Sequence, residues 1–369
     1  CWYCPDAPPS EASFSEAFSV LTGCTLETYR FRDLHPRLLL GTASDRYAGW
    51  LGQVYTREKY PGPLLTRTRK LGTTSFKETL LPIESVAEYF EHFPVLEIDF
   101  TFYEFLLDAE GKPTKTFQAL QKYRKFISPD DSLILKAPQR ISAQKIRHGG
   151  AFLENPDYLN PDAFVSRFFK PACELLGTSL RAFVFEQEYQ RKQDRVSSTA
   201  LARSLDEFFS GVPADERYHV ELRTESYLTD VLLQVLEKHG AGQVLSHWTW
   251  LPRLRKQFAL SGDRFHNAGR QAVIRLLTPL GMRYENAYAK AFPFDKVVAE
   301  MLQPTMLEET VELMAEAVKA GVTINVIANN RAGGNAPSIA LEIARRFLES
   351  FPPRRSMTDH PGGIGDKIR

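Results

Sequence analysis

The stretch IESVAEYFEHFPVLEIDFT, residues 83–101, contains two different periodicities on either side of one proline. Over residues 83–93 apolar side chains recur three and four positions apart, which is typical of an amphipathic helix. After Pro94 the period falls to two, and aliphatic or aromatic residues alternate with Glu97 and Asp99, as in a strand. A helix followed directly by a strand is the unit from which parallel sheets are built.

The same succession of strand and helix recurs along the chain. The runs with strand character are Arg37–Ser44, Val95–Thr101, Ser132–Ala137, Leu180–Gln187, Tyr218–Arg223, Gln243–Trp248, Ala272–Leu277 and Val322–Asn329. Stretches with helical spacing begin at Ile83, Thr116, Ala163, Ala200, Tyr227, Met306 and Ser338. Eight strands with helices between them, over about 315 residues, predict an α/β fold in the form of a single (β/α)8 TIM barrel. The competing fold, a doubly wound open sheet, lacks its usual glycine-rich fingerprint after the first strand.

The predicted barrel leaves a segment at each end of the chain. We expect an N-terminal extension at residues 1–36, the barrel at residues 37–351, and a flexible C-terminal tail rich in proline, glycine and charge at residues 352–369. Cys1 and Cys4 form a CxxC pair, with Cys24 further on, and this is half of a zinc-binding pattern. We leave open whether these three cysteines bind a metal.

Composition limits the classes of function. The chain has 46 Lys and Arg against 45 Asp and Glu, a formal net charge of +1, so total charge does not point to nucleic acid or a membrane surface. No apolar run approaches the roughly 18 residues that span a bilayer. No signal peptide is visible, although the chain does not begin with Met. Four cysteines are too few for a disulfide framework. We therefore expect a cytoplasmic protein without a membrane partner, and predict no cofactor.

Strand alternation also predicts which side chains point into the barrel. The outward face packs on helices and should be aliphatic, so the polar residues point inward. These are Glu97, Asp99, Thr101, Lys136, Glu221, Arg223, Arg275, Asn325 and Asn329. On Leu180–Gln187 the pattern leaves either Glu186 or Gln187 inward. Many of these residues lie toward the C-terminal ends of their strands, where barrel enzymes assemble their active sites.

So many inward charges allow two interpretations. Buried charges are costly unless they pair, so one hypothesis is an ion-pair lattice without chemistry. The other is a polar ligand pocket with catalytic acid–base groups among Glu97, Asp99, Lys136 and Glu221. The residues expected to contact the ligand are Tyr47, Trp50, Tyr103, Gln187, Arg223, His247, Arg275, Asn329 and Asn330. A divalent metal at Glu186, Glu221 and His247 is an alternative, which the nearby arginines would disfavour by repulsion.

Six motifs occur in order at the predicted strand ends. They are GTASDRYAGW from Gly41, LEIDFTFY from Leu96, LILKAPQRIS from Leu133, VELR from Val220, VIRL from Val273 and ANNRAGGNAPSIA from Ala328. In these motifs the chain resembles the YecE-like family, a group of TIM-barrel proteins whose biochemical function is not established. The resemblance implies the same barrel fold from Leu38 to Phe351.

Two loops are rich in cations. The loop after the first strand contains Arg57, Lys59, Arg67, Arg69, Lys70 and Lys77, and the segment after the sixth contains Arg253, Arg255, Lys256, Arg264 and Arg270. We expect both on the C-terminal face, near aromatic residues. Cations interleaved with aromatic rings suit a nucleotide or single-stranded nucleic acid.

The leading hypothesis is an enzyme that binds a small anionic, phosphate-bearing ligand at the C-terminal mouth, with hydrolysis and isomerisation both open. Arg223, Arg275, Lys136 and the 329–334 loop would hold the anion. The alternatives are a nucleic-acid-binding or nucleic-acid-processing barrel and a non-catalytic binding barrel. The sequence does not predict the oligomeric state.

Overall fold

The structure is a computed structural model that describes residues 29–148 and 151–351. Eight parallel strands close into a barrel in the order β1-β12-β11-β10-β9-β8-β5-β4, and β4 pairs again with β1. The strands are β1 Leu38–Ala43, β4 Val95–Ile98, β5 Ser132–Lys136, β8 Leu180–Gln187, β9 Tyr218–Leu222, β10 Gly242–His247, β11 Gln271–Leu276 and β12 Thr323–Ala328. The predicted (β/α)8 barrel is confirmed.

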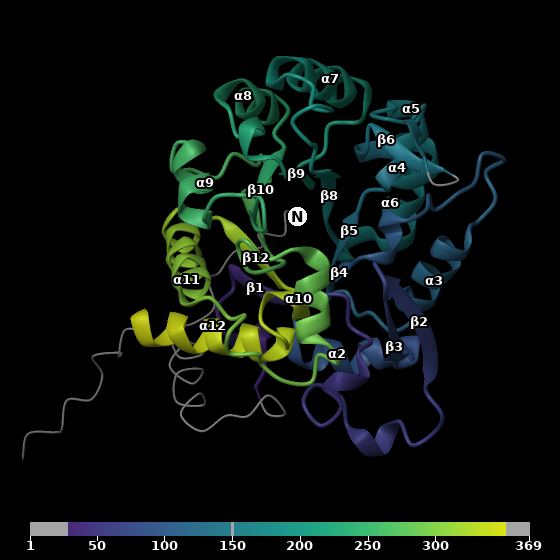
Figure 1. Cartoon of the computed structure of the whole chain (residues 1–369), viewed down its shortest axis with the longest axis vertical. Helices are drawn as coiled ribbons and strands as arrows, with labels where there is room; N and C mark the ends of the chain where they lie inside the picture. Colours follow the sequence, from purple (N-terminus) through teal and green to yellow (C-terminus); the bar gives the residue numbers. More distant parts are fainter. Residues whose placement is uncertain (1–28, 149–150, 352–369) are drawn as a thin grey trace, which may run out of the picture.

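Helices surround the strands (Figure 1). They are α2 Val86–His92, α3 Lys115–Arg124, α4 Gln139–Ser142, α5 Pro161–Phe164, α6 Lys170–Leu176, α7 Ser198–Gly211, α8 Asp230–Lys238, α9 Leu254–Leu260, α10 Tyr284–Ala291, α11 Pro304–Lys319 and α12 Ala336–Ser350. Side-chain caps begin several of them: Ser197 accepts from the Ala200 amide at α7, and Asn335 accepts from the Ser338 amide at α12.

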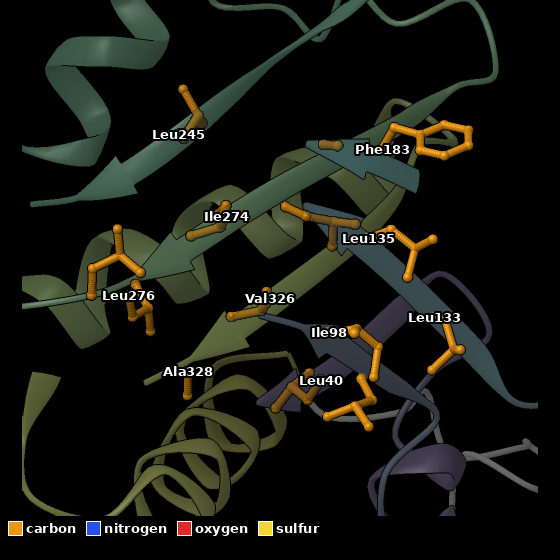
Figure 2. Packing of buried hydrophobic residues seen from close by; sticks show 14 of the residues in the cluster. Leu40, Ile98, Leu133, Leu135, Phe183, Leu245, Ile274, Leu276, Val326 and Ala328 are labelled. Atoms are coloured by element: carbon orange, nitrogen blue, oxygen red, sulfur yellow. The ribbon is translucent and has the colours of Figure 1, made fainter. Parts of the chain in front are cut away.

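The strand residues divide between two faces, as the alternation predicts. Figure 2 shows outward side chains such as Leu133, Leu135, Ile274 and Val326 in the layer between strands and helices. A separate cluster fills the barrel interior: Ala43, Val95, Ile134, Ala182, Val184, Val244, Val273 and Ile327. Two residues further along, on the same face, stand Glu97, Lys136, Glu186 and Arg275. The interior therefore changes from aliphatic to charged toward the C-terminal ends of the strands.

Several elements are not predicted by the sequence pattern. An antiparallel hairpin, β2 Leu65–Leu71 and β3 Thr74–Leu80, lies between β1 and α2. A second hairpin, β6 Lys145–His148 and β7 Ala151–Glu154, follows α4. The helix α10 follows β11.

The chain ahead of β1 begins to pack before the barrel starts. Tyr29, Phe31 and Leu34 are buried in the main core. Cys1, Cys4 and Cys24, for which metal binding was left open, and the C-terminal tail lie outside the described residues. Across residues 29–148 and 151–351, none of the helices combines the length and the hydrophobicity that crossing a membrane requires.

Candidate functional site

Arg275 lies at the centre of the charged layer. Its Nη2 lies 2.7 Å from Oε1 of Glu97, and its Nε donates to Oε2 of the same carboxylate at 2.8 Å. Its Nη1 contacts Glu221 and lies 3.4 Å from Oε2 of Glu186. Arg275 is only 2% exposed, so its ion pairs with these three carboxylates are buried in the protein interior.

Lys136 and Arg223 complete the layer. The Lys136 ammonium lies 2.7 Å from Oε2 of Glu186 and 3.1 Å from Oδ1 of Asp99. The Arg223 guanidinium reaches Oε1 of Glu186 at 2.5 Å and Oε2 of Glu221 at 3.1 Å. The ambiguity on β8 is thereby resolved, because Glu186 and not Gln187 joins the inward charges. The four predicted catalytic residues belong to one connected ion-pair network.

Within the network, the pKa values of Glu186 and Glu97 are shifted in opposite directions. Burial alone would raise the pKa of Glu186, but the cations Arg223, Lys136 and Arg275 outweigh it and hold that pKa well below its usual range. Burial raises the pKa of Glu97, although Arg275 opposes this. Glu186 therefore stays ionised, whereas Glu97 is the carboxyl that depends most on a single cation.

A pocket of about 390 Å³ opens above this layer, where β1, β4 and β12 end. These three strands are neighbours in the barrel. The residues around the pocket are Ser44, Asp45, Arg46, Tyr47, Arg67, Thr68, Arg69, Leu80, Glu97, Ile98, Asp99, Phe100, Tyr103, Tyr123 and Arg331. Four arginines and three tyrosines thus face one cavity.

Two of the pocket arginines lack a carboxylate partner. Arg46 Nε donates to the Leu81 carbonyl at 2.5 Å. The Arg331 guanidinium lies 4.4 Å from the centre of the Tyr284 ring, and its Nε is buried without a hydrogen-bond partner. Within residues 29–148 and 151–351, neither Arg46 nor Arg331 forms an ion pair. Their charge is available to a ligand.

Asp99 connects the charged layer to the pocket. Its side chain is 34% exposed, whereas that of Glu97 is fully buried. Burial would raise the pKa of Asp99, but Lys136, Arg331 and Arg275 outweigh it and lower the pKa below its ordinary value. Asp99 is therefore an ionised carboxylate that a bound molecule can reach.

The β2–β3 hairpin forms one wall of the pocket and packs against α10. Arg69 Nη2 donates to the Tyr284 hydroxyl at 2.7 Å, and Arg69 Nη1 lies 3.5 Å from Oε1 of Glu78. Tyr288 on α10 also hydrogen-bonds Glu78. Arg67 shares this carboxylate, so Glu78 balances one of the two positive charges that these arginines carry.

The structure places the predicted ligand contacts in different surroundings. Tyr47 and Tyr103 line the pocket together with Glu97 and Asp99. Burial raises the pKa of Tyr47 to about 12, so its hydroxyl stays protonated. Asn329 acts indirectly: its Oδ1 accepts from the Arg331 amide at 3.0 Å and so shapes the loop that carries Arg331.

Other predicted contacts are enclosed by the protein. Trp50 is buried and donates from Nε1 to Oδ1 of Asn330 at 3.2 Å, so these two residues bind each other. The Gln187 Oε1 lies 3.4 Å from the Tyr158 hydroxyl, and Gln187 is 3% exposed. None of these three side chains lines the pocket.

His247 is also enclosed. Its Nδ1 lies 2.8 Å from the Thr278 carbonyl, and burial lowers its pKa to about 4. In the described part of the chain, no group of three or more His, Cys, Asp or Glu side chains is arranged to hold a metal ion. The metal alternative at Glu186, Glu221 and His247 therefore gains no geometric support there.

Sequence reasoning missed Asp45 and Arg46 as pocket residues, and it assigned the 329–334 loop to the anion without naming Arg331. All three stand in motifs already quoted, GTASDRYAGW and ANNRAGGNAPSIA, and each follows the end of its strand. Strand alternation stops at those ends, so it does not predict where loop side chains point. Each arginine lies three residues after the last residue of its strand, and this position was the available signal.

One expectation about the basic loops is wrong. Arg264 and Arg270 follow the end of α9 and precede β11, so they lie at the N-terminal end of the barrel. Arg270 there donates to the Ala320 carbonyl, next to the start of β12. The cations after the sixth strand are therefore divided between the two ends of the barrel.

Together the fold and site define a single (β/α)8 barrel with an arginine-lined pocket at its C-terminal mouth. The family model described as protein of unknown function DUF72 matches residues 39–360. The chain belongs to this family, which is the YecE-like family that the motifs indicated.

Solved structures of the family share the fold. A DUF72 family protein from Enterococcus faecalis V583 is 15% identical, with a TM-score of 0.52, and the match covers 84% of this chain and 95% of that chain. A DUF72 family protein from Thermotoga maritima MSB8 is 14% identical, with a TM-score of 0.51 and coverage of 85% and 99%. The comparison with curated proteins gave no match.

Proposed function

We propose that the pocket binds a small ligand through an oxyanion group, phosphate or a close equivalent, and that the protein acts on this ligand as an enzyme. The observation that carries the proposal is the presence of two guanidiniums, Arg46 and Arg331, that face the pocket without a carboxylate partner. Guanidinium groups bind phosphate and carboxylate through paired hydrogen bonds, which suits them to this role.

The site of the anion differs from the sequence-based hypothesis. Arg223 and Arg275 already pair with buried glutamates, so they position the layer beneath the ligand. Asp99 is the exposed carboxylate beside Lys136, and we assign it the role of proton acceptor. A proton acceptor serves both hydrolysis, where it activates water, and isomerisation by proton transfer.

A thermal-shift titration with inorganic phosphate, sulfate and nucleotides tests the binding step. For a dissociation constant near 1 mM, about 10 mM ligand contributes about 1.4 kcal/mol, which raises Tm by about 2 °C. Arg331→Met should abolish the shift. Arg203→Met, an exposed residue on α7, is the matched control and should keep it. If no anion stabilises the protein, or Arg331→Met responds like the wild type, the proposal is wrong.

Turnover needs a separate measurement. Phosphorus NMR on a panel of phosphate monoesters detects both candidate reactions, because hydrolysis and isomerisation each change the environment of the phosphorus atom. Binding without any spectral change would support the non-catalytic barrel instead. The cytoplasmic location expected from cysteine usage remains part of the proposal.

The nucleic-acid alternative has less support from the geometry. Arg67 and Arg69 share Glu78, and Lys59 pairs with Glu88 at 3.0 Å. Lys256 pairs with Glu225, again at 3.0 Å. Part of the positive charge predicted for the rim is therefore locally balanced.

A further inference from the structure

Asp45 lies two residues after the end of β1, in the wall of the same pocket. It is only 3% exposed. Its Oδ1 accepts a hydrogen bond from the Tyr123 hydroxyl at 2.8 Å, whereas its Oδ2 is buried and has no hydrogen-bond partner. A buried carboxylate oxygen without a donor is costly, because the charge is neither paired nor solvated. A protonated Oδ2 would instead be a donor in search of an acceptor.

We propose that Asp45 is an uncharged carboxylic acid in the binding-competent pocket and donates its proton in a hydrogen bond to a fully ionised oxyanion, so that binding this anion takes up one proton. The proposal rests on the anion site proposed above and specifies its chemistry. A fully ionised oxyanion has only acceptors, so it matches a pocket that combines two guanidiniums with one acid hydroxyl.

The surroundings of Asp45 contain few charges. Arg46, on the same loop, is the charged group that acts on the carboxyl, and it forms no ion pair with it. The other neighbours are neutral phenols: Tyr123 from α3, Tyr89 from α2, and Tyr55, whose hydroxyl donates to the Asp45 carbonyl at 2.9 Å.

The balance of these groups makes Asp45 easier to protonate than an ordinary aspartate. Burial raises the pKa of Asp45 to about 6, although Tyr123 and Arg46 oppose the rise. Burial also raises the pKa of Tyr123 well above its ordinary value, so this hydroxyl remains a donor. Asp99, in the same pocket, has a lowered pKa and stays ionised. The pocket thus contains one acid and one base, which is the arrangement that proton-transfer sites use.

Sulfate is the appropriate probe, because it remains a dianion from pH 5 to pH 8, whereas phosphate itself titrates in that range. Isothermal titration calorimetry of the full chain at constant ionic strength should give a constant affinity below about pH 6. Above it, the affinity should fall about tenfold per pH unit, or roughly 100-fold by pH 8. Titrations in two buffers of different ionisation enthalpy should detect one proton taken up per sulfate at pH 7.

Two variants isolate the group responsible. Asp45→Asn keeps a hydrogen-bond donor without a titrating proton, so its affinity should be independent of pH and exceed that of the wild type at pH 8. Asp130→Asn, an exposed aspartate outside the pocket, should keep the wild-type profile.

The outcomes distinguish the two proposals. If sulfate binds in an Arg331-dependent manner but no proton is taken up, or Asp45→Asn retains the pH dependence, the role of Asp45 is wrong and the anion site stands. If sulfate does not bind at any pH, the anion site itself is wrong. The proton count needs only the unaltered protein, so it decides the question even where a variant fails to fold.

Discussion

Replacing Arg275 with methionine tests how much the charged layer contributes to stability. Methionine keeps much of the length of the side chain but removes the guanidinium that contacts Glu97, Glu186 and Glu221. The last two carboxylates retain other cations, since Arg223 contacts both of them and Lys136 contacts Glu186. Glu97 loses its ion-pair partner, so the cost falls mainly on this residue.

The size of that cost follows from what Glu97 does without its partner. Leaving the charge buried and unpaired costs several kcal/mol, so the carboxyl takes up a proton instead. From an ordinary pKa of 4.5, protonation at pH 7 costs about 3 kcal/mol, whereas at pH 5 it costs less than about 1 kcal/mol. We therefore expect Arg275→Met to lower the free energy of unfolding by up to about 3 kcal/mol at pH 7, since burial already raises the pKa of Glu97 in the wild type, and by much less at pH 5.

Urea-induced unfolding at pH 5, 6 and 7, at fixed ionic strength, measures this difference. The double variant Arg275→Met/Glu97→Gln removes the titrating group and should be more stable than Arg275→Met alone at pH 7, without the same pH dependence. A loss below about 1 kcal/mol at pH 7, or an equal loss at pH 5 and pH 7, would refute the reasoning.

Three further predictions test other parts of the molecule. The raised pKa of Asp45, about 6 against 3.8, means that its uncharged form stabilises the fold at low pH and that this contribution is lost as the pH rises through 6. Between pH 4.5 and 7.5 the wild type should therefore lose about 2 kcal/mol relative to Asp45→Asn in urea unfolding. Gly41→Ala should lower stability by about 1–3 kcal/mol in the same assay, because a Cβ there would lie 2.1 Å from the Val95 carbonyl oxygen in the paired strand. A fluorescent single-stranded oligonucleotide should show no salt-dependent binding in an anisotropy titration at physiological salt. Tight binding that weakens steeply with salt, and that Lys70→Ala reduces, would instead favour the nucleic-acid alternative.

The parts of the fold that the sequence predicts are those in which apolar residues recur at the spacing of a strand or a helix. All eight barrel strands contain short β-branched or aliphatic runs that locate them in the sequence, although the alternation in LRAFVFEQ does not decide which residue points inward. The β2–β3 hairpin does not alternate in this way, because LTRTRKL packs little apolar surface and most of its residues are exposed. The helix α10 contains only a short stripe, YENAYAKA, whose partners come from the hairpin more than 200 residues earlier. Neither element has a local signal that specifies its packing.

The same distinction applies to the candidate site: the directions of its strand side chains could be predicted, whereas those of its loop side chains could not. Inward charges such as Glu97 and Lys136 follow from period-two alternation, because the strand fixes their direction. Arg331 lies beyond the strand, and the Tyr284 ring, which is distant in the sequence, fixes the place of its guanidinium. Pairing also depends on distance: the sequence predicts that Arg275 points inward, but only the folded barrel shows which carboxylates it reaches.

The two interpretations of the inward charges therefore describe two layers of one structure. Arg275, Lys136 and Arg223 neutralise the buried glutamates, and this lattice fixes Lys136 where it contacts Asp99. Above it, the strand ends of β4, β1 and β12 supply the ionised Asp99, the protonatable Asp45 and the unpaired arginines. A lattice alone would not need unpaired cations at its surface, since each unpaired charge adds desolvation cost without a partner. A ligand would explain why these unpaired arginines lie at one side of the mouth, beside a cavity of about 390 Å³.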